Sequence, residues 1–466
     1  MPAQGERRCG MDLKDAQYKK MTEQPVSRLI LSLAVPTIIS MMVTAIYNTA
    51  DTYFVSQLGT SASGAVGIVM SLMGIIQSAG FLIGMGAGSW MSRLLGEKQE
   101  RLASEVAASG FYFSLLLGVI IAVCGVVFLD PLVTLLGATQ TIRPYAMEYA
   151  QYILYAAPFL IGSLTLNKML CAEGKARFAM VGIAFGGVLN IFLDPLFIFV
   201  FHMGIAGAAI ATALSQIVSF GILLYMFVSG RTIAKLNLRN ASRTLKRYVQ
   251  IASYGMPSFF RQGLASVAMI AMNKQAAAYG DSAVSAMAIV TKVFMLIFSV
   301  VIGFGQGYQP VAGYNYGARR YDRVKQAFLF MTRTATVFMV LFGAIGFWAA
   351  PQMIRLFIDS DPQVVQIGTE AMRMQCAAMP FLPLATCCNM TFQTIGKSKV
   401  ATLLASARQG YVFLPLVLIL PYFFGMKGVE LSQPLADAIS FFICIPFTVQ
   451  FFRELQQRQK EIQKEG

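Results

Sequence analysis

The amino-acid sequence predicts an all-α polytopic membrane protein whose twelve transmembrane helices form two homologous six-helix bundles. Three observations predict this class. The chain is 56% hydrophobic and 13% charged, with a mean hydropathy of +0.61, whereas soluble domains carry roughly 25% charged residues. Apolar runs of about 20 residues, long enough to cross a bilayer as helices, recur along the chain. The second half of the chain also repeats the first.

The duplication is visible as two nearly equal sequence offsets. Residues 36–96 align without a gap on residues 257–317 at an offset of 221, which pairs Pro36 with Pro257. A second block at an offset of 222 pairs Pro158, Asn167, Gly174 and Lys175 with Pro380, Asn389, Gly396 and Lys397. Because matches at one spacing extend over so many positions, we interpret the halves as copies of one ancestral unit.

The apolar runs give the position of each span. We expect spans at approximately 28–57, 64–92, 102–128, 140–170, 176–201, 206–229, 248–279, 283–314, 322–350, 364–394, 400–424 and 430–452. The corresponding organisation is a cytoplasmic N-terminal segment 1–27, a first lobe 28–229, a basic cytoplasmic linker 230–247, a second lobe 248–452 and a cytoplasmic tail 453–466. The polar first segment has no apolar core and no small-residue cleavage site, so we expect no signal peptide.

Basic residues in the loops predict the orientation, because Lys and Arg of short loops are retained on the cytoplasmic side. The linker carries Arg231, Lys235, Arg239, Arg243, Lys246 and Arg247. The hairpins near Gly59, Asp130 and Gly280 carry almost no basic residues. We therefore expect both termini in the cytoplasm and the chain in the cell (inner or plasma) membrane. The net charge of +15 suits an anionic inner leaflet, and no basic soluble face suggests nucleic-acid binding.

The even number of spans per half predicts a transport mechanism. Six spans return the chain to the side on which it started, so both halves enter the membrane in the same direction. Parallel repeats of this kind are related by an axis along the membrane normal and face each other across a central cleft that can open alternately to each side. This arrangement favours a rocking transporter over a channel.

Two acidic residues within the apolar spans are candidates for an ion site. In the alignment of the two halves, Asp51 corresponds to Met272 and Asp194 corresponds to Leu416. An Asp at the centre of a membrane helix costs roughly 2.5 to 3.5 kcal/mol and usually marks an ion or proton pathway. Both lie six or seven residues, or roughly 9 Å, below the outer end of their spans, and Thr212 reaches the same depth.

Polar neighbours one helical turn deeper extend these acids into a single predicted pocket. They are Tyr47 and Asn48 in the first span and Asn190 in the fifth, at spacings of three or four residues. Such a pocket suits a proton, or a sodium ion held by carboxylate, amide and hydroxyl oxygens, and the sequence leaves both open. The alternative is structural: either Asp caps a helix break or pairs with a Lys.

Pro36 lies inside the first span, on the same predicted helix as Asp51. A proline removes one backbone hydrogen bond and permits a kink. We therefore interpret Pro36 as a hinge whose bend responds to ion binding at Asp51 and Asp194. A static packing kink is the alternative.

These residues resemble the pattern of the multidrug and toxic compound extrusion family, MATE. The resemblance covers nearly the whole chain and is carried by Pro36, Asp51, Asn190, Asp194, Pro195, Thr212 and the repeated Gly-Lys after spans four and ten. It implies two lobes around a V-shaped cavity and export of bulky, often cationic, amphipathic compounds driven by inward flow of sodium ions or protons. It also implies a first-lobe polar network of Tyr47, Asp51, Asn167, Asn190, Asp194 and Thr212.

The second lobe departs from one branch of that family. That branch carries carboxylates in the seventh and tenth spans, where this chain has Arg261, Gln262, Asn389 and Gln393. We therefore do not expect a second cation site there. Arg261 follows Pro257 by four residues, and we interpret it as an interfacial residue whose long side chain snorkels toward water. A role in substrate binding is the alternative.

The lining of the cavity is less determined. The 27 Met and 35 Phe of the chain suit varied apolar and cationic ligands. Gln77, Ser78, Gln306 and Gln309 are candidate polar lining residues. Hydrogen bonds between packed helices are the alternative explanation for them.

No catalytic motif is found. Residues 395–398 end like a phosphate-binding loop, but Thr391 stands where that motif has its first glycine. His202 is the single histidine, so the chain has no two-histidine metal motif. We predict a non-enzymatic secondary active multidrug efflux transporter that exchanges amphipathic, often cationic, organic compounds for protons or sodium ions by alternating access. The expected partners are small-molecule drugs or organic cations and membrane lipids, with no cofactor, no nucleic acid and no metal beyond a possible sodium at Asp51 and Asp194, and we expect a monomer.

Two alternatives stay open. A flippase for a lipid-linked precursor would place several cationic residues along its central cavity to bind a pyrophosphate headgroup. The more remote alternative is an ion channel or a receptor. The duplicated halves and the buried acids favour a coupled carrier over both.

Overall fold

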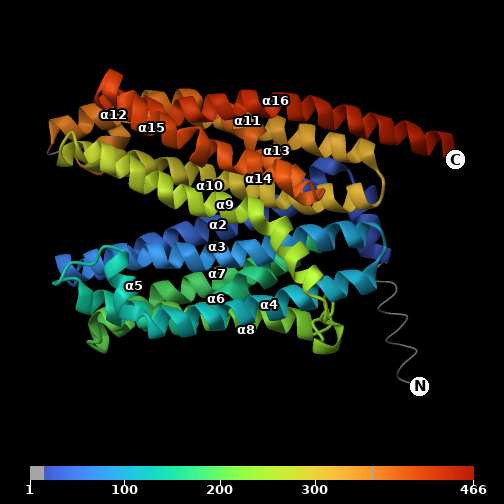
Figure 1. The fold of residues 1–466 in the computed structure, drawn as a ribbon, viewed down its shortest axis with the longest axis horizontal. Coiled ribbons are helices and arrows are strands. Elements are labelled where there is room, and N and C mark those ends of the chain that lie inside the picture. The colour runs from blue at the N-terminus through green and yellow to red at the C-terminus, as the bar shows by residue number, and fades with distance from the viewer. Residues whose placement is uncertain (1–14, 359–360, 466) are drawn as a thin grey trace.

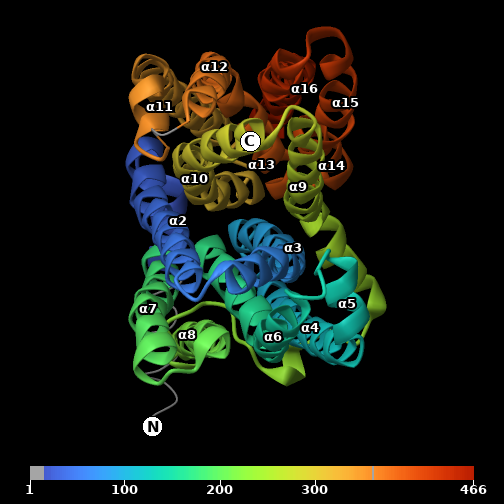
Figure 2. The ribbon, with the colours of Figure 1, turned by 90° about the vertical axis from the view of Figure 1, so that its left-hand side faces the viewer.

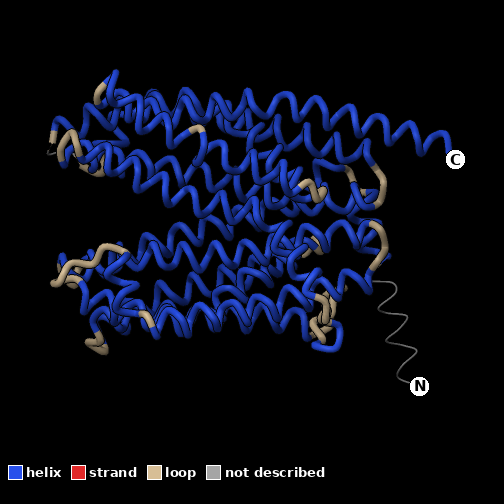
Figure 3. Tube along the Cα trace, in the orientation of Figure 1, coloured by secondary structure: helices blue, strands red, loops and turns tan. Residues whose placement is uncertain are grey.

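The computed structural model describes residues 15–358 and 361–465, and within them the chain is almost entirely helical (Figure 3). Of the predicted N-terminal segment, residues 1–14 lie outside the described residues. Residues 15–23 form a short helix before the first long one. Figure 1 shows the long helices running side by side in two layers, with both chain ends at the same end of the molecule. We call this the termini end and the opposite one the far end.

The first layer contains the first half of the chain. Its helices are α2 (Val26–Ser56), α3 (Thr60–Gly96), α4 (Glu100–Val127), α5 (Leu129–Leu135), α6 (Arg143–Ala172), α7 (Ala176–Pro195), η1 (Leu196–Val200) and α8 (Gly204–Val228). A short turn, η2 (Leu238–Asn240), follows in the linker to the second layer. The short helix α5 was not predicted, and the fifth span ends in the wide π-turn η1 directly after Pro195.

The second layer contains the second half. Its helices are α9 (Leu245–Ala277), α10 (Asp281–Gly317), α11 (Tyr321–Arg355), α12 (Pro362–Ala378), η3 (Met379–Phe381), α13 (Leu382–Thr394), α14 (Ser398–Ser406), η4 (Ala407–Tyr411), α15 (Phe413–Phe424) and α16 (Met426–Glu465). The tenth predicted span is broken at η3, beside Pro380 and Pro383, and α16 extends past the predicted span end at 452.

Within the described residues, ten helices are long and apolar enough to cross a membrane. The seventh and tenth predicted spans are helical but are not among these ten. In α9, Arg261 and Lys274 interrupt the apolar sequence, and the tenth span is divided into two shorter helices. The view from the far end shows both elements lying within the second layer beside the other long helices (Figure 2).

The two layers make their closest contacts at the termini end. A Cβ on Gly86 of α3 would collide with the backbone at Ile251 of α9, which shows that the two helices touch there. Further along α3, a Cβ on Gly74 would lie 3.7 Å from Ser266, and one on Gly67 would have no atom within 4 Å. The layers are therefore packed backbone to backbone at the termini end and separate toward the far end.

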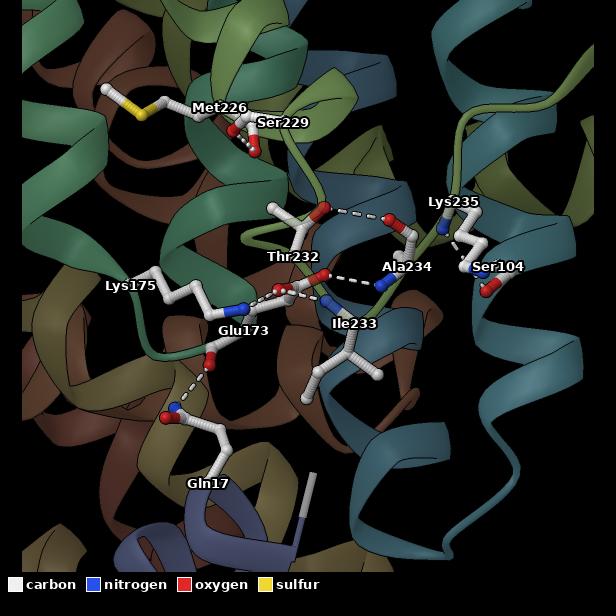
Figure 4. Close-up of polar contacts among 10 residues, drawn as sticks. All are labelled: Gln17, Ser104, Glu173, Lys175, Met226, Ser229, Thr232, Ile233, Ala234 and Lys235. Carbon is white, nitrogen blue, oxygen red and sulfur yellow. Dashed lines mark hydrogen bonds and ion pairs between the residues drawn. The ribbon is translucent and has the colours of Figure 1, made fainter. Parts of the chain in front are cut away.

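The linker is held against the first layer by Glu173, whose side chain is fully buried (Figure 4). Its carboxylate accepts the backbone N–H groups of Ile233 (3.0 Å) and Ala234 (2.8 Å) and pairs with the Lys175 ammonium (2.7 Å). The Glu173 carbonyl accepts a hydrogen bond from Gln17 of the short N-terminal helix (2.6 Å). This one residue therefore joins the turn between α6 and α7, the linker and the start of the chain.

Candidate functional site

The predicted acids lie on neighbouring helices of the first layer. Asp51 lies on α2, Asp194 on α7 and Thr212 on α8, and α7 packs against both α2 and α8. Gly187 of α7 permits the close approach of α2, because a Cβ there would lie 3.0 Å from the Tyr47 ring.

Hydrogen bonds connect the predicted side chains on α7 and α8. The Asn190 amide donates to Asp194 Oδ1 (3.1 Å) and to Thr212 Oγ1 (3.3 Å). Asn190 and Asp194 are four residues apart and so share one face of α7. All three side chains are buried, with Asp194 fully inaccessible. The structure therefore brings Asn190, Asp194 and Thr212 into one group.

Asp51 has a partner that the sequence did not indicate. The hydroxyl of Tyr149, a fully buried residue of α6, donates to Asp51 Oδ2 at 3.4 Å. A tyrosine in an apolar span does not stand out from aromatic residues that only pack, which explains why it was missed. Its place in the fourth span, near the outer end that Asp51 also approaches, was the available signal.

Three oxygen atoms of this site accept no hydrogen bond from the described residues: Asp51 Oδ1, Asn190 Oδ1 and Asp194 Oδ2. Buried polar atoms are nearly always hydrogen-bonded, so unpaired ones call for an explanation. The ion pairs found in the described residues involve neither Asp51 nor Asp194. Neither acid pairs with a Lys, and neither is bonded as a helix cap. Carboxylate and amide oxygens left in this state can accept a proton or bind a hard cation.

The other predicted residues on α2 border this group. Tyr47 is buried and contacts α7, whereas Asn48 is only partly buried. Pro36 lies about four helical turns from Asp51, closer to the termini end, where α2 packs against α10. The hydroxyl of Thr37 beside it donates to the carbonyl of Gly303 on α10 at 2.6 Å. The predicted hinge thus lies at a contact between the two layers.

The structure does not bring Asn167 to the acids. Its amide donates to the carbonyl of Ala179 on α7 at 3.0 Å. Ala179 precedes Asn190 by eleven residues, or roughly 16 Å along the helix. Asn167 therefore joins α6 to α7 at a different depth from the site.

The predicted polar lining residues have separate environments. Ser78 bonds to the Gly74 carbonyl of its own helix (2.8 Å), and Gln77 is partly buried. Gln309 donates weakly to the Met390 carbonyl on α13 (3.4 Å), and Gln306 accepts a hydrogen bond from Lys168 across the two layers (2.8 Å). Of the four, only Gln306 bonds between the layers.

Arg261 also differs from the expectation. Its guanidinium donates to Asn389 Oδ1 on α13 at 3.1 Å. The side chain is thus held by a neighbouring helix of the same layer instead of snorkelling along α9 to the membrane surface.

The second layer contains a buried acid that the sequence analysis overlooked. Asp437 of α16 has a fully buried side chain and pairs with Arg408 of η4 at 2.7 Å. It also accepts hydrogen bonds from Gln375 (3.0 Å) and Gln433 (2.9 Å). Asp437 lies near the start of the predicted span 430–452, where its acidic side chain was the available signal. The Arg408 guanidinium neutralises the Asp437 carboxylate. Asp51 and Asp194 of the first layer have no such basic partner among the described residues.

The MatE family model matches residues 36–196 and 257–419, two segments that begin at the duplicated prolines Pro36 and Pro257. Multidrug export protein MepA of Staphylococcus haemolyticus (strain JCSC1435) is 26% identical over 434 residues, covering 93% of this chain and 95% of that protein. MepA of Staphylococcus aureus (strain NCTC 8325 / PS 47) is 26% identical over 428 residues, covering 92% and 94%.

Solved structures agree with this result. A MATE in complex with MaL6 superimposes with a TM-score of 0.89 at 26% identity, covering 95% of this chain and 99% of the other. An outward-facing multidrug resistance MATE transporter of the MOP superfamily gives 0.88 at 26% identity, covering 94% and 98%. The predicted all-helical membrane fold is confirmed by these matches. The fold has twelve membrane helices, so α9 and the broken α12–α13 supply the two spans that fall outside the ten apolar helices.

Proposed function

The chain belongs to the MatE family of multidrug efflux transporters, and on that premise we propose that Asp51 and Asp194 are its coupling site for inward-moving protons or sodium ions. The family consists of transporters, not enzymes. The exported compounds are drug-like molecules, as the name of the MepA relatives indicates for those proteins. We infer amphipathic and often cationic substrates for this chain.

The observation that carries the proposal is the charge imbalance at the site. Asp51 and Asp194 are 5% and 0% exposed, and no basic side chain of the described residues pairs with either. A buried carboxylate without a counter-charge is unstable, so the site favours occupancy by a proton or a cation. Asn190 and Thr212 add the neutral oxygens that a sodium ion needs, whereas a proton needs only the carboxylates.

Coupling requires that the occupied site influence the contact between the layers. Helix α2 provides a direct connection, because it carries Asp51 and also Thr37, which bonds to Gly303 of the other layer. The two residues are fourteen positions apart, or roughly 21 Å along the helix. Pro36 lies beside Thr37 and lacks a backbone N–H, so α2 can bend there. We propose that ion binding at Asp51 changes this bend and weakens the contact with α10.

The orientation completes the proposal. From the basic loops we infer that the termini end faces the cytoplasm, and this is the end at which the layers are packed together. The structure then corresponds to a state closed to the cytoplasm. Export requires a second state in which the same contacts separate and the substrate enters from inside.

Dye transport in reconstituted vesicles tests this function. Wild type, Asp51→Asn and Asp194→Asn are compared while sodium and proton gradients are imposed separately, with a fluorescent cationic dye as substrate. Asp130→Asn is the matched control, because Asp130 is an exposed acid whose partner, Arg143, is also exposed. We expect both site variants to bind the dye but to lose gradient-driven transport, and the effective gradient identifies the ion. Undiminished transport in both variants would remove the acids from the coupling mechanism.

A further inference from the structure

Lys168 of α6 is a buried cation that the proposed mechanism does not use. Its side chain is 5% exposed. The ammonium donates to Gln306 Oε1 of the other layer at 2.8 Å and lies 5.3 Å from the centre of the Phe81 ring. The ion pairs of the described residues give it no carboxylate.

The fold itself does not require a base at this position. The duplication places Met390 of α13 at the equivalent position of the second layer, where an uncharged side chain occupies the same structural context. Burying an ammonium that is bonded only to an amide and an aromatic face is unfavourable. A lysine retained under these conditions is a candidate for a ligand-binding role.

A second cation strengthens the local positive charge. Arg261 of α9 is close enough for its charge to act on Lys168. Like Lys168, it is bonded to a neutral amide, that of Asn389 at 3.1 Å. Both cations therefore donate to uncharged amide oxygens. An anionic group in place of either amide would bind more strongly, because hydrogen bonds between charged partners are stronger than those to neutral acceptors.

The surroundings of Lys168 belong to both layers. A cavity of about 20 Å³ beside it, enough for about one water molecule, is lined by Gly84, Gly88 and Cys171 of the first layer and by Gln306, Gln309 and Thr394 of the second. Since its walls lie on opposite layers, this cavity widens when the layers separate at the termini end. Lys168 then loses Gln306 and faces the opening.

We propose that Lys168, supported by Arg261, is an anion-binding subsite that receives the carboxylate of amphipathic zwitterionic substrates as they load from the termini end. The proposal rests on the proposed export function and extends its substrate class beyond cations. The subsite is separate from the coupling site, because Lys168 and Tyr149 are nineteen residues apart on α6, or roughly 28 Å. One region of the protein therefore binds the coupling cation, and another binds the acidic group of the substrate.

Two dyes that differ in one group test the subsite. Rhodamine B carries a free carboxylate beside a cationic ring system, and its ethyl ester is the same cation without the carboxylate. Equilibrium binding of each dye to the detergent-solubilised full chain is measured by fluorescence anisotropy, with no ion gradient. The variants are Lys168→Met, which introduces the side chain of the duplicated position, and Lys168→Arg, which retains the charge.

We expect Lys168→Met to weaken binding of rhodamine B by about ten- to a hundredfold, the range for losing a hydrogen bond to a charged group. Binding of the ester should be unchanged, and Lys168→Arg should retain most of the affinity for rhodamine B. Equal loss for both dyes would assign Lys168 a structural role, and no loss for either would remove it from binding. Unchanged ester binding also shows that Lys168→Met is folded.

Two further arms separate related outcomes. Short-chain phosphatidic acid is added as a competitor, because a lipid phosphate has the same charge as a carboxylate. The lipid's inhibition constant is compared with the dissociation constant of rhodamine B. If the lipid binds more tightly than rhodamine B to wild type but not to Lys168→Met, the subsite belongs to a lipid headgroup and the substrate assignment is overturned. Gradient-driven transport of the ester by wild type is measured in parallel, because its absence would contradict the proposed function without bearing on the dye-binding difference.

Discussion

Asn167 and Asn389 make the same hydrogen bond in the two layers. The Asn167 amide donates to the Ala179 carbonyl at 3.0 Å, and the Asn389 amide donates to the Ala401 carbonyl at 2.7 Å. Each donor and acceptor is displaced by the same 222 positions. A contact preserved in both copies, only one of which holds the group of Asp51 and Asp194, has a structural role in joining successive helices.

Replacing Asn167 by leucine should therefore lower stability without changing ion coupling. The Ala179 carbonyl loses its partner, at a cost of about 1–3 kcal/mol for an unsatisfied buried group. Thermal unfolding in detergent should occur at a lower temperature for Asn167→Leu, and at a still lower one for Asn389→Leu, which also removes the acceptor of the Arg261 guanidinium. The dye-transport rate is measured under a sodium gradient and under a proton gradient. The ratio of these two rates should be the same in Asn167→Leu as in wild type. Loss of gradient dependence at unchanged stability would return Asn167 to the coupling site.

Mutation of the Arg408–Asp437 ion pair should destabilise the protein, whereas neutralising Asp51 should not. Arg408→Met leaves Asp437 buried without a counter-charge, which costs about 3–5 kcal/mol. Combining it with Asp437→Asn removes the unpaired charge, so the double variant should recover most of the lost stability in a double-mutant cycle of unfolding free energies. Asp51→Asn, which breaks no ion pair, serves as the comparison and should not destabilise. Additive losses in the cycle would show that the two side chains are not coupled.

The apolar runs were sufficient to predict the helices because span length depends mainly on local hydropathy. The π-turns Leu196–Val200 and Ala407–Tyr411 and the break at Met379–Phe381 were not predicted, because they arise from how neighbouring helices pack around Pro195, Gly410 and Pro380. Asp194 could be identified since a carboxylate is rare in an apolar span. Tyr149 and Lys168 could not be assigned partners, because those partners lie on other helices.

Pro36→Ala should impair coupled transport while leaving dye binding intact. Alanine restores the N–H that can bond to the Ser32 carbonyl, so α2 becomes stiffer at the contact with α10. Pro257→Ala is the matched control, because Pro257 occupies the duplicated position on α9, a helix that has Met272 in place of Asp51. We expect gradient-driven dye efflux to fall at least about fivefold more for Pro36→Ala than for Pro257→Ala, a difference of about 1 kcal/mol. Full coupled transport by Pro36→Ala would contradict the hinge.

Gly255→Ala should open the termini end. A Cβ at Gly255 would collide with the backbone carbonyl of Leu82 on the facing helix, so the packed state must loosen. Cys171 is 6% exposed and lines the cavity between the layers, which makes it a native probe of opening. Alkylation of Cys171, followed by mass spectrometry of its peptide, should be faster than in wild type. Gly263→Ala on the same helix, where a Cβ meets no atom within 4 Å, should leave the rate unchanged.

The short helix of residues 15–23 should stabilise the same closed end, because it contacts both layers. Gln17 donates to the Glu173 carbonyl of the first layer, and the Asn315 amide of the second layer donates to the Met21 carbonyl at 3.0 Å. Met21 itself is fully buried in this junction. Contacts made to both layers at once are lost when the layers separate, so they favour the closed state only. Met21→Ala should therefore raise the alkylation rate of Cys171, whereas Lys19→Ala, at an exposed position of the same helix, should not. Identical rates in the two variants would show that this helix lies on the molecule without holding it shut.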